Sequence, residues 1–309
     1  MLPFKLIFHP AFTVDLGPHV FPAQKYRLVR ERLLEAGLAG PEDFVEPRPA
    51  TDEDVLRVHT REYVRKIKTG DLSIEEARTL EVPWSRELVE AVWLAAGGAI
   101  EAARRARRDG RGILIGGGFH HAFPDHGEGF CLVHDVAVAI AALRASGDAV
   151  RVAIVDLDVH HGNGTAAIFC TDPLTFTVSL HQENNYPAVK PPSRVDVGLP
   201  DGATDEEYLA ALDGPLARAL AYRPDLLFYL AGADPYEHDL LGGLGLTLEG
   251  LAERDRRVFR AARAAGVPVA VALAGGYAER SRDTVAIHCN TVRVAAEVYG
   301  APRGTAIAG

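Results

Sequence analysis

The sequence has 309 residues, of which 48% are hydrophobic and 24% are charged, as in an ordinary soluble globular protein. Its net charge of −9 argues against a nucleic-acid partner held by a general basic surface, and no apolar segment approaches the roughly 20 residues that a membrane span needs. Three cysteines are too few for a disulfide framework, and with no signal peptide recognisable they predict a cytoplasmic protein.

Short apolar runs rich in β-branched residues recur along the chain and predict buried parallel strands. These runs lie at 5–8, 112–116, 151–157, 174–180, 225–231 and 267–274. Helical segments are expected between them, at about 85–108, 134–146, 205–222 and 248–265. Ser73 with Glu76, and Thr204 with Glu207, have capping-box spacing and mark helix starts. The one basic cluster, 103–111, is interpreted as the solvated end of a helix.

This alternation predicts a doubly wound α/β fold: three layers, α/β/α, around a mostly parallel central sheet. No repeat, low-complexity linker or break in composition divides the chain, so residues 1–309 are expected to form a single domain. Ligands of such sheets bind beyond the carboxyl ends of the strands. Unusual Gly, His, Asp and Tyr residues follow four strand ends, in segments 116–131, 155–164, 232–239 and 275–277.

The stretch "VDLDVHHGNG", 155–164, places ionisable side chains directly after a buried strand. Burial of such groups costs several kcal/mol unless they are paired or bind a metal. Alternate side chains of an extended chain point the same way, so Asp158 and His160 can reach one ion, with Asp156 on the same side. This donor set suits Zn²⁺, and Asp234 is the best candidate for a third protein ligand. The alternative is a structural Asp–His pair at a helix N-terminus.

The segment "GGGFHH", 116–121, ends a strand with a tight glycine turn that presents two histidines. The dinucleotide-binding fingerprint would need a glycine at His121, so that interpretation fails. His120 and His121 are predicted to be acid–base groups because histidine titrates near neutral pH. Tyr277, after "AGG", can donate a hydrogen bond to a developing oxyanion. Cys131 is interpreted as a packing residue because no base is dedicated to it.

The motifs "GGGFHH", "GEGFC", "DLDVHHGNG", "GADPYEHDLLGGLGLT" and "GGY" occur in this order. Together they resemble the zinc-dependent histone deacetylases of the arginase/deacetylase superfamily, over about residues 5–299. The first motif, Asn163 and segment 239–260 are most similar to class IV, and a bacterial member is our first interpretation. The resemblance implies one deacetylase-like catalytic domain with the arginase/deacetylase fold. It also implies a hydrolase that removes acetyl or longer acyl groups from lysine side chains with a metal-activated water.

The resemblance implies two bound ions. One Zn²⁺ per chain would be bound by Asp158, His160 and Asp234. A structural K⁺ would be held by side chains and carbonyls at the ends of two neighbouring strands, namely those of Asp156, Asp158, His160, Ser179 and Leu180.

Catalytic roles are implied in the same way. His121 would be the general base and then the acid toward the leaving amine, while His120, oriented by Asp156, would help to polarise the metal-bound water. Tyr277 would stabilise the tetrahedral oxyanion. Many deacetylases have aspartate where this chain has Asn163, beside His121. Asparagine can fix the orientation of the imidazole but cannot stabilise its protonated form by charge.

Substrate-binding roles follow from the resemblance as well. The residues concerned are Gly118, Phe130, Leu241, Gly275 and Glu81. The apolar pair would line an acyl-lysine tunnel, the glycines would allow close backbone approach, and the glutamate would grip the substrate backbone at the rim. Segment 182–196 matches the class I pattern poorly, which leaves Tyr186 as one candidate for a tunnel wall.

Other functions stay open at this point. The substrate is expected to be an acyl-lysine protein or a small acylated amine. The alternative function is that of a deacetylase of a small molecule such as an acetylpolyamine or an acetoin-related metabolite. A binuclear manganese ureohydrolase is disfavoured because Gly162 stands where an additional bridging aspartate is needed. A non-catalytic relative is disfavoured because the proposed ligands, both histidines and Tyr277 are all retained. The oligomeric state is not predicted.

Overall fold

Eight strands form one sheet in which every neighbouring pair runs parallel. The computed structural model describes residues 1–300. The order across the sheet is β2-β1-β3-β8-β7-β4-β5-β6. The strands are β1 (Lys5–Ile7), β2 (Phe44–Val45), β3 (Arg111–Leu114), β4 (Val152–Asp156), β5 (Thr175–Gln182), β6 (Val195–Leu199), β7 (Leu226–Leu230) and β8 (Val269–Ala272).

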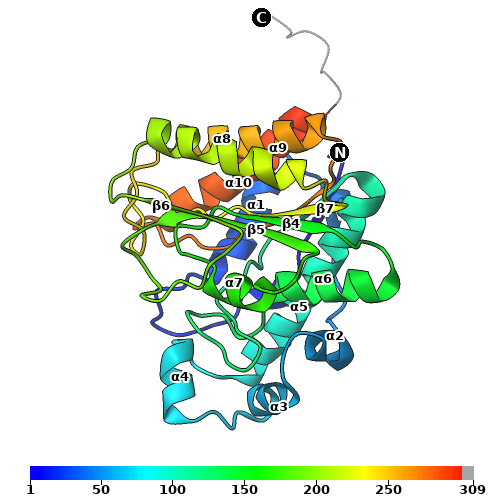
Figure 1. The fold of residues 1–309 in the computed structure, drawn as a ribbon, viewed down its shortest axis with the longest axis vertical. Helices are drawn as coiled ribbons and strands as arrows, with labels where there is room; N and C mark the ends of the chain where they lie inside the picture. Colours follow the sequence, from blue (N-terminus) through cyan, green and yellow to red (C-terminus); the bar gives the residue numbers. More distant parts are fainter. Residues whose placement is uncertain (301–309) are drawn as a thin grey trace, which may run out of the picture.

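Helices cover both faces of this sheet, which gives the expected three layers (Figure 1). One outer layer contains α1 (Gln24–Glu35), α8 (Asp205–Ala221), α9 (Leu248–Ala264) and α10 (Ser281–Tyr299). The other contains α5 (Arg86–Asp109), α6 (Asp135–Ser146) and α7 (Asn163–Phe169). Beyond α5 lie the short helices α2 (Asp52–Leu56), α3 (Arg61–Thr69) and α4 (Ile74–Leu80).

The predicted elements are confirmed, with small shifts at their ends. The six apolar runs form β1, β3, β4, β5, β7 and β8, and the four helical segments form α5, α6, α8 and α9. Both capping boxes are present, at the starts of α4 and α8. The sheet is more uniform than expected, since the mostly parallel arrangement proves entirely parallel. The sequence did not predict β2, β6, α1, α2, α3, α7 or α10.

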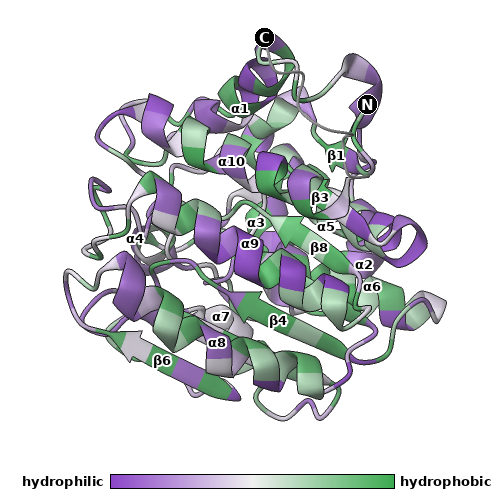
Figure 2. Ribbon diagram, turned by 90° about the horizontal axis from the view of Figure 1, so that it is seen from above, coloured by the Kyte–Doolittle hydropathy of each residue, from purple (hydrophilic) through white to green (hydrophobic). Residues whose placement is uncertain are grey.

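The central strands are apolar because helices cover both of their faces. All residues of β4, β7 and β8 are buried, as parallel strands in a doubly covered sheet require. Figure 2 shows β4 and β8 as largely hydrophobic, whereas α8 and α9 alternate between hydrophobic and hydrophilic residues. The hydrophobic side of those helices therefore packs on the sheet and the other side meets water.

The register of the sheet brings several strand ends to one level. Asp156, the last residue of β4, pairs with Leu230 of β7 and with Ser179 of β5. Leu230 in turn pairs with Ala272, the last residue of β8. The segments that follow β4, β7 and β8 therefore leave the sheet at the same edge, as the fold class predicts for a ligand site.

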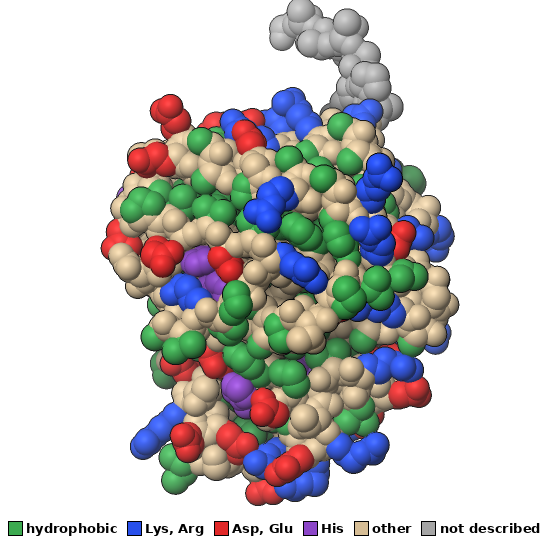
Figure 3. Space-filling model, viewed as in Figure 1, with side chains coloured by type: hydrophobic (Ala, Val, Ile, Leu, Met, Phe, Trp, Pro, Cys, Tyr) green, Lys and Arg blue, Asp and Glu red, His purple; other side chains and the backbone are tan. Residues whose placement is uncertain are grey.

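The surface carries both acidic and basic side chains rather than one continuous basic patch. Figure 3 shows basic and acidic side chains interspersed over one face. Most of the basic cluster 103–111 forms the last turns of α5, and its last residue, Arg111, begins β3. Arg107 donates hydrogen bonds to the carbonyl oxygens of Asp148 and Asp225. Among residues 1–300, no helix combines the length and the apolar character that crossing a bilayer requires.

Candidate metal centre and active site

Asp158, His160 and Asp234 come together at the carboxyl edge of the sheet. The first two follow β4 and the third follows β7. All three are buried, and one potential ligand atom from each lies within 4.8 Å of the others. His160 Nδ1 lies 3.0 Å from Asp158 Oδ1 and 3.5 Å from Asp234 Oδ2. The two carboxylates and the imidazole thus face one point, as a divalent cation requires.

The strongest sign of a cation site is one oxygen of Asp234. Its Oδ2 is buried and has no hydrogen-bond partner among the described residues. Burial, and next the negative charge of Asp158, raise the pKa of the Asp234 carboxyl. A buried carboxylate oxygen without a partner is costly, and a bound cation removes that cost. The residues present therefore fit a catalytic zinc ion with three protein ligands.

Backbone amides hold the two carboxylates in place. Gly275 N donates to Asp158 Oδ2 over 2.8 Å, and Val159 N donates to Asp234 Oδ1 over 2.9 Å. His160 N donates to Asp158 Oδ1 over 3.0 Å. Such outer contacts fix the direction of the ligand lone pairs.

Gly275→Ala is expected to weaken metal binding by about 10–100-fold, in the range seen for lost outer-shell support. An added Cβ would lie 1.9 Å from Asp234 Oδ2 and 2.6 Å from Asp158 Oδ2, so both carboxylates must move. Competition with a chelator, followed by elemental analysis, measures the change. Gly214→Ala in α8 is the control, because its added methyl group meets no atom within 4 Å. Equal metal affinity in the two variants would contradict this role of Gly275.

Two histidines lie beside the candidate metal centre in different surroundings. His120 Nδ1 lies 2.7 Å from Asp156 Oδ2, whereas His121 Nδ1 lies 2.7 Å from Asn163 Oδ1. Burial, and next the neighbouring His120, hold the pKa of His121 well below its usual value. Burial also acts to lower the pKa of His120, but Asp156 and its neighbours outweigh it and raise that pKa to about 9. The pair can therefore divide into a cationic and a neutral imidazole.

Tyr277 follows β8 and points into the same site. Its ring centroid lies 6.4 Å from that of His160 and 6.1 Å from that of Phe130. Burial, and next the charge of Asp158, raise the pKa of its hydroxyl well above the usual value. The hydroxyl therefore stays protonated and can donate a hydrogen bond.

Lys25 is a residue of this region that the sequence did not reveal. Its Nζ donates to Ala274 O over 2.9 Å and lies 5.4 Å from the centroid of the Tyr277 ring. Burial lowers the pKa of its ammonium to about 8. Nothing in the local sequence of α1 distinguishes a buried lysine from an exposed one. Its burial results from the packing of α1 on a segment some 250 residues further along.

The predicted substrate residues lie around the mouth and the floor of the site. One pocket, of about 190 Å³, is lined by Glu81, Phe130, Leu241 and Tyr186 together with His121, His160 and Tyr277. Gly118 lies deeper, and an added Cβ there would come within 2.7 Å of the Ala274 side chain. Cys131 is buried next to this inner space, and its Sγ donates to Gly129 O. That contact fits the packing role predicted for it.

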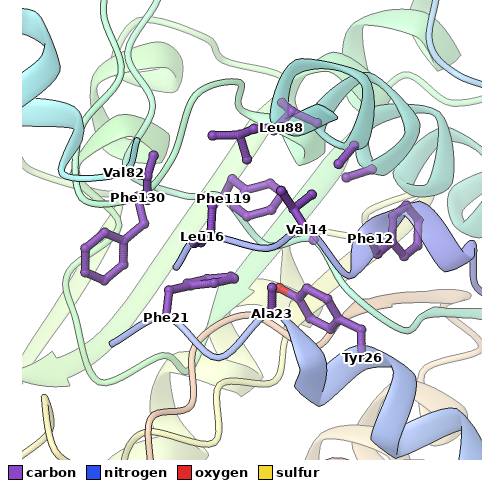
Figure 4. A pocket seen from close by; sticks show the side chains of 14 residues that line it. Phe12, Val14, Leu16, Phe21, Ala23, Tyr26, Val82, Leu88, Phe119 and Phe130 are labelled. Atoms are coloured by element: carbon purple, nitrogen blue, oxygen red, sulfur yellow. The ribbon is translucent and has the colours of Figure 1, made fainter. Parts of the chain in front are cut away.

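A small apolar pocket adjoins the inner part of the site (Figure 4). Phe21, Tyr26, Phe119 and Phe130 line both spaces. The rest of its wall comes from the N-terminal segment and α5, namely from Phe12, Val14, Leu16, Ala23, Leu88, Ala91, Val92 and Ala95, with Val82 and Gly117. The sequence did not predict this pocket, because its residues come from segments that are far apart along the chain.

The predicted K⁺ ligands lie at the ends of β4 and β5. Asp156 and Ser179 are register partners, and Leu180 follows Ser179. Asp156 Oδ1 accepts a hydrogen bond from Asp158 N over 3.2 Å. Beside them, the buried Arg254 guanidinium donates to Leu157 O. The arrangement brings the predicted ligands together, and the ion itself stays a prediction.

A second group that could hold a metal within the described residues is His161, His181 and Asp196. One ring nitrogen of each histidine and both Asp196 oxygens have protein partners, whereas His161 Nδ1 has none among the described residues. His161 Nε2 lies 3.1 Å from Asp196 Oδ1, and Asp196 Oδ2 accepts from Ser193 N. His181 Nδ1 lies 3.0 Å from Ser179 Oγ. We therefore interpret this group as a hydrogen-bonded cluster that ties β5 and β6 to the end of β4.

Comparisons of the sequence and of the structure with known proteins point to the same family. The family described as "Histone deacetylase domain" matches residues 19–292. Histone deacetylase 2 of Arabidopsis thaliana is 34% identical over 87% of this chain and 72% of its own. The acetoin utilization protein AcuC of Staphylococcus aureus is 30% identical over 76% of this chain and 66% of its own. The crystal structure of the HDA15 HD domain superposes with a TM-score of 0.80 at 27% identity, covering 95% of this chain and 88% of the other.

Proposed function

Since this chain belongs to the histone deacetylase family, whose members hydrolyse amide bonds, we propose that it is a zinc-dependent deacylase of lysine side chains. The observation that carries the proposal is the convergence of three metal-ligand residues, two histidines and Tyr277 at one sheet edge. The proposed catalytic domain comprises residues 1–309, of which 301–309 lie outside the described residues. The likeness to class IV, the bound K⁺ and a cytoplasmic location are further parts of this proposal.

When bound by Asp158, His160 and Asp234, Zn²⁺ supplies a Lewis acid and lowers the pKa of a water ligand toward about 7. The neutral His121 takes a proton from the attacking water through its free Nε2. The water oxygen joins the acyl carbon, and the C–N bond then breaks. His121 returns the proton to the departing amine, which leaves together with a carboxylate product.

Two further side chains act on the developing charge. The Tyr277 hydroxyl donates a hydrogen bond to the carbonyl oxygen as that oxygen becomes negative. His120, paired with Asp156, places a positive charge beside the attacking water. Around the mouth, Phe130, Leu241 and Tyr186 supply apolar walls for the methylene stem of a lysine, and Glu81 lies at the rim.

A second candidate function is the deacetylation of a small molecule such as an acetylpolyamine or an acetoin-related metabolite. It is favoured by the similarity to an acetoin utilization protein. The experiment that separates the two is a kinetic screen of the zinc-loaded protein against acyl-lysine peptides and acetylpolyamines. The lysine proposal expects higher kcat/KM for the peptides. Turnover confined to polyamines would assign the site to small amines instead.

The apolar pocket beside the metal centre leads us to expect activity that rises with acyl-chain length. Each methylene buried there contributes up to about 0.8 kcal/mol, or nearly fourfold in kcat/KM. The measurement is a series of lysine peptides with acyl chains of two to twelve carbons. Ala95→Leu, which narrows the pocket, should reduce activity toward long chains and spare acetyl-lysine, the internal control. A steep fall in the parent beyond three carbons would reject this use of the pocket.

A further inference from the structure

Glu128, which belongs to the motif "GEGFC" but received no role in the sequence analysis, lies behind the proposed general base. Asn163 Nδ2 donates to Glu128 Oε1 over 2.5 Å, and the Tyr186 hydroxyl donates to the same oxygen over 2.7 Å. The other end of the Asn163 amide, its Oδ1, lies 2.7 Å from His121 Nδ1. We propose that Glu128 is a positioning residue that sets the orientation of the Asn163 amide and thereby the tautomer of His121. This inference rests on the proposed function only where it concerns turnover.

The orientation follows from the inventory of donors and acceptors. An ionised carboxylate can only accept hydrogen bonds, so the amino group of the Asn163 amide must face Glu128. The amide oxygen then faces His121, and an oxygen can be satisfied there only by a proton on Nδ1. A neutral imidazole with its proton on Nδ1 has a free lone pair on Nε2, which is the form that a general base needs.

The opposite orientation would remove the base. Without an acceptor at position 128, the Asn163 amide can turn its amino group toward His121. Nδ1 would then have to accept, and the proton of a neutral ring would move to Nε2. Asparagine carries a donor and an acceptor of almost equal size, so sterics do not separate the two orientations. What separates them is an acceptor oxygen at position 128 that faces the Asn163 amide and also receives the Tyr186 hydroxyl.

Glu128 is held on a short turn that packs directly on the base. Glu128 N donates to Cys131 O, and Cys131 N donates back to Glu128 O, over 3.1 and 2.9 Å. The turn is also fastened to the end of α4, where Gly129 N donates to Thr79 O. A Cβ at Gly129 would lie 2.8 Å from His121 Cδ2, so the backbone touches the imidazole. The element that carries the carboxylate therefore cannot move independently of the ring it positions.

The hydrogen bond from Tyr186 gives a competing explanation that the experiment has to separate. Its ring packs edge-on against His121 with centroids 5.0 Å apart, and it lines the mouth of the site. Glu128 would then serve only to anchor a wall that contacts substrate. A residue that only anchors a substrate-contacting wall affects KM, whereas a residue that orients the Asn163 amide affects kcat. The pair Glu128–His126, with nitrogen and oxygen 3.7 Å apart at an exposed position, is too loose to explain the placement.

The experiment compares Glu128→Ala, Glu128→Gln and His126→Gln in steady-state kinetics with one acyl-lysine peptide. Glu128→Ala should lower kcat by about 10–100-fold, the usual effect of losing an outer partner, with KM changed less than about twofold. Glu128→Gln should recover most of the activity, because its side-chain oxygen still accepts both hydrogen bonds. His126→Gln removes the loose contact to the other carboxylate oxygen, together with exposed contacts to Asp125 and Phe123, and should match the parent. Glu128→Met, which keeps the side-chain length, replaces the alanine variant if that variant fails to fold.

A spectroscopic measurement tests the tautomer without turnover. In protein labelled with ¹⁵N-histidine, the His121 signals are assigned by their loss in His121→Ala. They should show a proton on Nδ1 in the parent and in Glu128→Gln, and a mixture of tautomers in Glu128→Ala. This readout still decides the inference if the parent shows no deacylase activity, a result that would reject the proposed function alone.

Three results would overturn the inference. The first is Glu128→Ala with normal kcat and raised KM, which makes the residue a wall anchor. The second is Glu128→Gln as impaired as Glu128→Ala, which assigns the effect to charge rather than to orientation. The third is an unchanged Nδ1-protonated signature of His121 in Glu128→Ala.

Discussion

Replacing Asp234 by asparagine is expected to remove the bound metal and to lower turnover by at least about 10³-fold, since about 4 kcal/mol of transition-state stabilisation by the metal is lost. The asparagine oxygen can still accept the hydrogen bond from Val159 N, so the loop after β7 keeps its support. What disappears is the negative charge and the Oδ2 atom, which accepts no hydrogen bond from the described residues. Elemental analysis and kcat with an acyl-lysine peptide measure the two effects.

The thermal stability of Asp234→Asn also tests the assignment of Asp234 as a metal ligand. The metal-free parent buries a carboxyl oxygen without a partner, and an amide at that position avoids burying a charge. Metal-free Asp234→Asn should therefore unfold at a temperature no lower than that of the metal-free parent. Asp196→Asn is the matched control from the other His–Asp group and should keep one equivalent of metal. Full activity in Asp234→Asn, or two equivalents of catalytic metal in the parent, would refute the assignment.

Tyr277→Phe is expected to lower kcat by about 10²–10³-fold with little change in KM, as for other single donors to an oxyanion. The phenyl ring can keep the edge-on contacts of Tyr277 with Phe21 and Phe130, so the walls of the site should stay in place. Only the hydroxyl is lost. Because burial and the charge of Asp158 raise its pKa well above the usual value, that hydroxyl is protonated and can donate at neutral pH.

Kinetics at saturating and at limiting substrate concentrations distinguish a role of Tyr277 in the transition state from a role in substrate binding. Tyr299→Phe is the control, because it also removes one hydroxyl hydrogen bond, the 3.1 Å contact to Phe259 O in the layer of α9 and α10. Its kcat should equal that of the parent. A Tyr277→Phe variant with normal kcat and raised KM would make Tyr277 a substrate-binding residue.

The buried strands and the strand-end residues could be predicted because their signals are local. A run such as "RVAIVDL" is apolar on both faces, and the ionisable residues after it are conspicuous at once. The edge strands lack such a continuous apolar run. β6 alternates between buried and more exposed residues, and β2 is only two residues long. The helix α1 is rich in Arg, Lys and Glu, which hides the narrow apolar stripe that it buries.

Features that depend on distant segments could not be predicted from the sequence. Burial of Lys25 requires the segment after β8, and the apolar pocket requires the N-terminal segment and α5. The contact of Glu128 with Asn163 joins a turn to the first residue of α7. When only neighbours along the chain are considered, Lys25 and Glu128 look like ordinary polar residues of a helix and a loop. Tertiary packing alone gives them a role.

The position of β8 in the sheet has a consequence for how the chain is assembled. The last strand to be synthesised lies in the middle, between β3 and β7. Until residues 269–272 have left the ribosome, the sheet consists of two unjoined parts, β2-β1-β3 and β7-β4-β5-β6. Each part then exposes a flat apolar edge, and such edges recruit other chains. A nascent or truncated chain that ends before β8 is thus an aggregation hazard, and its two parts cannot be joined into the native sheet.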